Sequence, residues 1–157
     1  PDRPHEGPWE VCQSWHRCGG WGYYREEKFL DNATVLSRLA RIRAAGGNYL
    51  LNIGPKPDGE LPDAAYESLG QLAAWMASNG PAIKDTVAGP WPARCSLPVT
   101  RRRGVWYVHV LQNHTGPIVL HNVPEPAAVS LLRTHDQIAC THGDQTLPIS
   151  LAGNKRR

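Results

Sequence analysis

Two stretches of the chain place apolar residues at helical spacing. In residues 34–45 the apolar side chains recur every three to four positions, while the arginines fall on the other side. Residues 62–79 repeat this pattern, and the apolar side of this second stretch consists of Tyr66, Leu69, Leu72, Ala73 and Met76. Asp31 or Asn32 suits the N-cap of the first helix. The sequence therefore predicts two amphipathic helices, each burying its apolar side.

A short apolar run, Asn48 to Ile53, lies between these helices. It is too brief for a helix and is bounded by glycines, which is typical of a strand buried on both faces. Residues 9–15 alternate loosely and predict a strand before the first helix. Strand, helix, strand and helix in this order indicate a parallel α/β unit. Such folds bind ligands at the carboxyl ends of their strands, here near the polar loop Gly54–Gly59.

The hydrophobic period changes from helical to two in the last third of the chain. Four short strands are predicted there, at residues 105–112, 118–123, 129–133 and 147–151. They predict a small antiparallel sheet or β-sandwich. A proline-rich connector, residues 83–98, precedes them. We therefore predict two domains, residues 1–88 and residues 89–157.

Charge and length exclude several classes of function. The 157 residues carry 17 basic and 14 acidic side chains, a balance that argues against a nucleic-acid surface, and no stretch could span a membrane. Residues 1–8 resemble a mid-protein loop, so we expect the chain to be the C-terminal part of a longer protein. The cysteines and histidines lack metal-binding spacing, and we predict no metal and no cofactor. Cys12 and Cys18 could form a disulfide, although buried thiols are the commoner state.

Aromatic residues gather near the predicted first strand. Trp9, Trp15 and Trp21 lie close together in the sequence, and the last of them belongs to a glycine-rich segment, Gly19–Tyr24. Large aromatics commonly pack in a core, but their flat rings also match the C–H face of a sugar. Glycines beside aromatic residues suit a binding loop. Composition alone favours core packing over sugar binding.

Several segments resemble the family 29 glycoside hydrolases, the α-L-fucosidases. The segment Gly-Gly-Asn-Tyr-Leu-Leu-Asn-Ile-Gly-Pro-Lys-Pro-Asp-Gly at 46–59 is closely similar to a segment of that family. Trp9-Glu10, Trp21-Gly22-Tyr23 and residues 75–83 resemble further family elements in the same order. A strand of the family's C-terminal domain is similar to residues 105–111. The likeness runs from about Trp9 to Leu151.

The resemblance implies a fold and a reaction. Family members contain an eight-stranded β/α barrel followed by a β-sandwich, so residues 1–88 would supply the last two βα units of the barrel and residues 89–157 the sandwich. They hydrolyse terminal α-L-fucose from fucosylated glycans with retention, through an aspartate nucleophile and a second carboxyl group. The resemblance places that aspartate upstream of Pro1. The chain alone is therefore expected to be inactive.

The resemblance also implies site residues. Glu10 is a candidate acid/base, since a carboxyl group between Trp9 and Val11 would be partly desolvated, which raises its pKa. A structural carboxylate, or an acid/base outside the chain, is the alternative. Trp21 matches an aromatic position that packs on the methyl side of fucose, and Trp9 and Tyr23 are further substrate-binding candidates. Simple structural roles are expected for Asn48, Asn52 and Asp58.

Two other functions fit the same residues. Aromatic loops and a β-sandwich would also serve a non-catalytic carbohydrate-binding protein built on this scaffold. A degenerate relative could use the barrel end as a purely structural element. In each case, two βα units by themselves would expose a strand edge and apolar helix faces, so we expect the isolated chain to self-associate.

Overall fold

A computed structural model describes residues 7–26, 28–112 and 114–151. Its first half consists of strand β1 (Glu10–Ser14), helix α1 (Asn32–Ala44), strand β2 (Asn48–Asn52) and helix α2 (Asp63–Asn79). The strands pair in parallel, with Glu10 opposite Asn48 and Ser14 opposite Asn52. The order and the parallel pairing confirm the predicted α/β unit.

Local signals set the ends of the helices. The Asp31 side chain caps α1 by accepting a hydrogen bond from the Thr34 backbone N–H at 2.8 Å, and this contact lowers the pKa of Asp31. After α1 the chain turns at Gly46, whose φ of 88° suits a residue without a side chain. Pro62 precedes the first residue of α2, where a missing N–H breaks no helical hydrogen bond.

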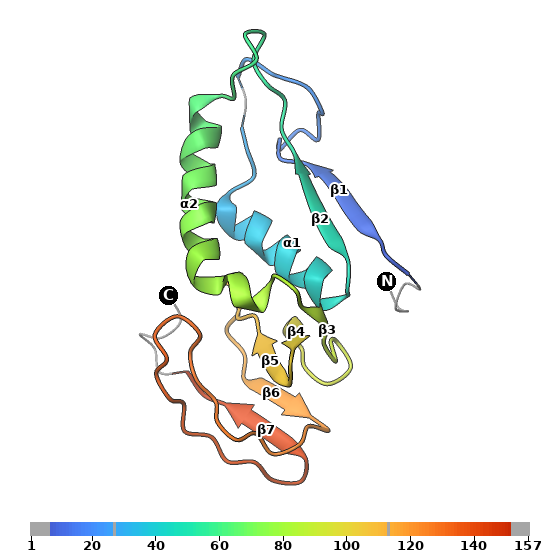
Figure 1. The fold of residues 1–157 in the computed structure, drawn as a ribbon, viewed down its shortest axis with the longest axis vertical. Helices are drawn as coiled ribbons and strands as arrows, with labels where there is room; N and C mark the ends of the chain where they lie inside the picture. The colour runs from blue at the N-terminus through green and yellow to red at the C-terminus, as the bar shows by residue number, and fades with distance from the viewer. Residues whose placement is uncertain (1–6, 27, 113, 152–157) are drawn as a thin grey trace.

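The β1–β2 pair is covered on one face only. Figure 1 shows α1 and α2 together on one side of the two strands. Tyr49 and Leu51 of β2 pack in the small core on that side, whereas Leu50, between them, is 49% exposed. The prediction that 48–53 is buried on both faces is therefore wrong for this structure. Burial of the second face would require further elements across the sheet, and the described residues provide none.

Helix α2 shows the same incomplete burial. Tyr66 is 51% exposed and Leu69 is also exposed, although both belong to the predicted buried side. The fully buried residue of this helix is Ala65, which packs with Trp15 and Val35. The predicted apolar side of α2 thus lies largely at the surface, because only one neighbouring helix contacts it within the described residues.

The second half is built from short antiparallel strands. A 3₁₀ helix, Gly80–Ala82, leads into β3 (Val87–Ala88), β4 (Val99–Arg102) and β5 (Val105–Val108), which form one sheet. Strands β6 (Ile118–His121) and β7 (Thr146–Ile149) form another. Side chains from both sheets share a hydrophobic core whose buried members are Cys95, Leu97, Val99, Ile118, Leu120, Val123 and Leu147.

Two strand predictions need correction here. Residues 129–133 form no strand, and Ser130 makes only an isolated bridge with Gln137. Strand β3 instead falls inside the segment expected to be a connector, residues 83–98, where prolines hid the pattern, and β4 begins directly after that segment. The antiparallel character of this half is confirmed. A sandwich arrangement and the domain division after residue 88 stay predictions.

Polar contacts join the two halves. The Arg43 guanidinium of α1 donates to the Thr86 carbonyl at 2.6 Å. The buried Thr100 hydroxyl donates to the Ala82 carbonyl at 2.7 Å, and its oxygen lies 2.9 Å from Nε2 of His109. Since that hydroxyl proton is committed to Ala82, Nε2 of His109 carries the proton of the neutral ring. Burial lowers the pKa of His109 to about 4.

Candidate functional site

The loops that follow β1 and β2 meet at the carboxyl ends of these strands. Ser14 and Asn52 are opposite each other in the strand register, and the Trp15 N–H donates to the Asn52 carbonyl at 2.9 Å. Beyond this pair of residues, hydrogen bonds from side chains hold the loop. The Ser14 hydroxyl donates to the Gly20 carbonyl, and Nδ2 of Asn52 donates to the Trp21 carbonyl at 2.9 Å. The loop after β1 is therefore fastened to both strand ends.

Glycines allow the two loops to approach closely. A side chain at Gly54, after β2, would bring its Cβ within 2.2 Å of the Gly22 backbone carbon and 2.4 Å of the Tyr23 nitrogen. A Cβ at Gly20 would likewise lie 2.2 Å from the Tyr24 ring. At Gly54, where the close atoms are backbone, only a residue without a side chain fits unless the loop moves, whereas at Gly20 a shift of the Tyr24 side chain would make room.

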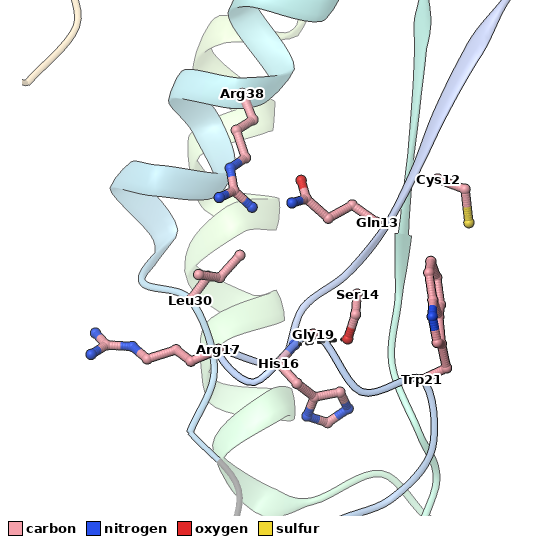
Figure 2. Close-up of a pocket in the computed structure, with 9 residues that line it drawn as sticks. All are labelled: Cys12, Gln13, Ser14, His16, Arg17, Gly19, Trp21, Leu30 and Arg38. Atoms are coloured by element: carbon pink, nitrogen blue, oxygen red, sulfur yellow. Dashed lines mark hydrogen bonds between the residues drawn. The ribbon is translucent and has the colours of Figure 1, made fainter.

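The fastened loop presents Trp21 at the open face of the sheet. Figure 2 shows Trp21 and Cys12 on one side of the strands, with Gln13 and Arg38 on the other side. Trp21 is 56% exposed, and Tyr23 and Tyr24 are exposed beside it. We call this exposed set, Trp21, Tyr23 and Tyr24, the aromatic rim. Its Trp21 lies on the face that the helices leave uncovered (Figure 2).

Trp15 lies behind this loop in the core. Its indole N–H donates to the Leu30 carbonyl at 2.9 Å, and its ring centroid lies 5.2 Å from that of Phe29. His16 is also buried, with its ring 5.3 Å from Phe29 and 5.7 Å from Tyr24. Core packing is therefore the correct interpretation for Trp15. Trp21, six residues later, is free to contact a ligand.

A pocket of about 280 Å³ opens along the carboxyl half of β1 (Figure 2). Its walls come from β1 (Cys12, Gln13, Ser14), from the loop that follows (His16, Arg17, Gly19, Trp21, Leu30) and from α1 (Arg38). Polar and cationic groups thus face the helix side of the pocket, and an aromatic ring borders the opposite side. Such a mixed lining suits a polar ligand with one apolar surface.

The loop after β2 is a turn stabilised by its own side chains. The Lys56 N–H donates to the Glu60 carbonyl at 2.8 Å, and the Glu60 N–H donates to Oδ1 of Asp58 at 3.0 Å. This backbone contact and the nearby Lys56 ammonium, 3.5 Å from Asp58, lower the pKa of Asp58. Asp58 forms a turn and Asn52 holds a loop, so these predicted structural roles are confirmed.

Glu10 and Trp9 lie at the opposite end of β1. Glu10 precedes Ser14 by four residues, which places it about 13 Å from the carboxyl end at the usual strand rise. Its side chain is exposed, so the expected partial desolvation is absent here. The Trp9 ring packs on Gly47, where an added Cβ would lie 2.6 Å from it. Of the predicted site residues, the structure therefore places Trp21 on the pocket, Tyr23 exposed in the same loop but not among the lining residues, and Glu10 and Trp9 elsewhere.

Metal and disulfide chemistry find little support in the described part of the chain. No three His, Cys, Asp or Glu side chains within it converge as metal ligands would. Cys12 and Cys18 are free and exposed, so the alternative of a disulfide between them is not realised, and neither is a buried thiol. Cys95 is the buried thiol, and burial raises its pKa. No described helix has both the length and the apolar character needed to cross a membrane.

Ser14 was not singled out by the sequence, although it is central to this site. The available signal was positional, because Ser14 and Asn52 are each the last residue but one of a predicted strand, 9–15 and 48–53. Their pairing depends on the strand register, which the sequence pattern did not define. Once the register is known, two hydrogen-bonding side chains at adjacent strand ends mark the place where a loop is held.

Comparisons with known proteins agree with this architecture. The sequence model described as Alpha-L-fucosidase matches residues 1–81. Bovine tissue alpha-L-fucosidase is 33% identical over 110 residues, which cover 68% of this chain and 22% of the bovine protein. The human tissue enzyme is 35% identical over 102 residues, covering 63% of this chain and 21% of its own length. The chain thus spans about a fifth of these relatives.

Solved structures extend the likeness beyond the part that the family model matches. A crystal structure of Thermotoga maritima alpha-fucosidase in complex with fucose superposes with a TM-score of 0.79 at 25% identity, covering 99% of this chain and 38% of that one. Alpha-L-fucosidase isoenzyme 1 from Paenibacillus thiaminolyticus gives 0.78 at 26% identity, covering 92% and 36%. This chain belongs to the α-L-fucosidases, family 29 of the glycoside hydrolases.

Proposed function

We propose that this chain forms the last two βα units of a fucosidase barrel, together with part of the rim around its fucose pocket. The observation that carries this proposal is the one-sided β1–β2 sheet. Parallel strands with helices on one face and Leu50 exposed on the other match a barrel wall whose inner face awaits the remaining strands. Residues 89–157 would be the accessory β-sandwich.

The aromatic rim is the proposed contact with the sugar. Barrel enzymes bind substrate at the carboxyl ends of their strands, where Trp21 and Tyr23 lie. Fucose carries a methyl group where its 6-hydroxy analogue carries a hydroxymethyl group. An apolar indole beside that carbon favours the methyl group, because a buried hydroxyl without a hydrogen-bond partner costs free energy.

Glu10 fits the acid/base role less well than a structural one. The two carboxyl groups of a retaining glycosidase lie about 5–5.5 Å apart across the scissile bond, at the substrate site. Glu10 lies at the amino end of β1, away from the aromatic rim. We therefore favour an acid/base from another part of the fucosidase polypeptide, with the aspartate nucleophile likewise supplied from outside residues 1–157.

NMR titration with two sugars tests the proposed sugar contact. We expect L-fucose to shift the indole N–H resonance of Trp21, and L-galactose, which adds the C6 hydroxyl, to shift it less. Trp21→Ala removes the resonance and should abolish the shifts at its neighbours. Tyr66→Ala, on the exposed side of α2, is the matched control and should leave them unchanged. Equal responses to the two sugars would contradict the assignment of an apolar wall.

An activity assay separates the fucosidase proposal from its alternative. The pure chain should release no 4-nitrophenol from the aryl α-L-fucoside, because the covalent route needs a nucleophile that it lacks. The alternative, a non-catalytic carbohydrate-binding protein, draws on the three exposed aromatics of the rim. Weak fucose contact, seen only as NMR shifts at high sugar concentration, fits the barrel fragment, whereas affinity strong enough for calorimetry would favour that alternative. Turnover by the isolated chain would contradict the inference that its nucleophile is missing.

A further inference from the structure

Two side chains hold consecutive carbonyl groups of the loop that carries Trp21. The Ser14 hydroxyl bonds the Gly20 carbonyl, and Nδ2 of Asn52 bonds the Trp21 carbonyl at 2.9 Å. These carbonyls belong to the peptide units immediately before and after the Trp21 Cα. Fixing both units fixes the φ and ψ of Trp21, and with them the direction of its side chain.

We propose that Ser14 and Asn52 act together as positioning residues, a clamp that sets the orientation of the Trp21 indole. The sugar-binding consequence rests on the proposed function, whereas the clamp itself concerns the loop alone. Neither residue touches the sugar in this proposal. Each acts through Trp21, and Ser14 is nearly inaccessible at 4% exposure.

The anchors are themselves rigid. Ser14 and Asn52 are partners in the parallel register, and the backbone carbonyl of Asn52 accepts the Trp15 N–H. The Ser14 oxygen also accepts the His16 N–H at 3.1 Å, so its donor and acceptor capacities are both used. The clamp therefore transmits the geometry of the sheet to the loop, which otherwise lies at the surface.

The surroundings of the clamp leave the loop little freedom in one direction. Gly54 touches the Gly22 backbone so closely that no Cβ fits, which blocks movement of the loop toward β2. On the other side Trp21 is 56% exposed and little else restrains it. Loss of the clamp should thus release the ring outward, with a small effect on global stability because the loop buries little apolar area.

Substitutions that remove one donor and keep the shape test the clamp. Asn52→Asp replaces the donating amide by a carboxylate, which cannot donate at pH 7, and Ser14→Ala removes the hydroxyl. We expect amide hydrogen exchange in residues 19–24 to rise about two- to tenfold in each, the range that one lost hydrogen bond supports. Ser14→Thr retains the hydroxyl and should restore slow exchange.

The matched control is Asn48→Asp at the other end of β2. Asn48 accepts a hydrogen bond from Arg43 at 3.1 Å, a role that a carboxylate can also fill. This variant should leave exchange in the loop unchanged. Thermal unfolding of every variant shows whether the fold is intact, and Asn52→Asp decides the matter if Ser14→Ala fails to fold.

The sugar titration separates the clamp from the function on which it rests. If the clamp acts as proposed, Asn52→Asp accelerates exchange and weakens the L-fucose shift of the Trp21 indole about two- to tenfold. If exchange is faster in the variants but L-fucose does not shift the Trp21 indole resonance of the unmodified chain, the clamp stands and the proposed function is contradicted. Unchanged exchange in folded Ser14→Ala and Asn52→Asp would overturn the clamp.

Discussion

The two halves of the molecule differ in how completely they bury their apolar residues. Among the described residues, the core cluster of the C-terminal half has seven buried members, whereas the cluster around β1, β2 and the helices has three, Trp15, Val35 and Ala65. Leu50 and Tyr66 lie exposed in that first half despite their core-like pattern. The larger core belongs to the half with less regular secondary structure.

This difference shows that regular elements do not by themselves make a closed unit. A parallel pair of strands has two faces and two edges, and α1 and α2 cover one face (Figure 1). Antiparallel hairpins can instead pack face to face and seal their own core. The first half consequently has an uncovered sheet face on which further secondary-structure elements could pack. The second half contributes more buried apolar area to the stability of the chain.

The largest expected effect on the free energy of unfolding comes from replacing leucine by alanine, in one variant for each half. Leu120→Ala removes a buried side chain of β6 from the C-terminal core and should lower the free energy of unfolding by about 2–5 kcal/mol. Leu50→Ala makes the same chemical change on the exposed face of β2 and should cost less than about 1 kcal/mol. Urea denaturation measures both. Equal losses would show that the inner face of β2 is covered in solution.

The next largest effect is a pH dependence of the free energy of unfolding, caused by His109. The His109 side chain is partly buried, and desolvation lowers its pKa to about 4 from an ordinary 6.5, so the ring is neutral at pH 7. The unfolded chain therefore binds a proton below pH 6.5 that the folded chain does not bind until about pH 4. The stability contributed by neutral His109 is complete above pH 6.5 and is lost as the pH falls toward 4, by up to about 3 kcal/mol.

Substitution of His109 isolates this contribution. His109→Gln can still donate to the Thr100 hydroxyl oxygen but does not titrate. Its free energy of unfolding should therefore change less than that of the unmodified chain between pH 7 and pH 4.5. His121→Gln, on the exposed end of β6, is the control and should retain the original slope. Identical slopes for all three proteins would contradict a folded-state pKa of His109 near 4.

Local signals explain why most of the first half was predictable. The N-cap at Asp31, the helical spacing of apolar residues and the glycines around β2 each act within a few residues, so the elements and their parallel order follow from the sequence. Burial was less predictable. The exposure of Leu50 and Leu69 depends on which other elements cover the sheet and α2, and a hydrophobic pattern carries no information about that coverage.

The site was predictable only in part, for a related reason. Trp21 and Tyr23 could be chosen because glycines beside aromatics suggest a binding loop, and family resemblance gave them a role. Glu10 was chosen by the same resemblance, but its place at the amino end of β1 depends on strand direction and length. The pairing of Ser14 with Asn52 required the register between strands 38 positions apart in the sequence.

The smallest change in the free energy of unfolding is expected for a substitution at the unpaired edge of β1, which should nevertheless alter self-association clearly. Within the described residues β1 pairs only with β2, so its other edge offers free N–H and C=O groups to a second chain. The Trp15 N–H and the Trp9 carbonyl bond to β2. In a parallel ladder alternate residues face the same neighbour, so the Cys12 N–H points to the free edge and the Val11 N–H to β2.

Proline at these two adjacent positions should therefore act in opposite ways. Cys12→Pro removes a donor that β2 does not use, so it should reduce concentration-dependent association in sedimentation velocity while changing the free energy of unfolding by less than about 1 kcal/mol. Val11→Pro removes a ladder hydrogen bond and should destabilise the first half markedly. If Cys12→Pro leaves association unchanged, we would infer that the chains meet through the exposed apolar faces around Leu50 and Tyr66, because a proline in the middle of the free edge should weaken edge pairing.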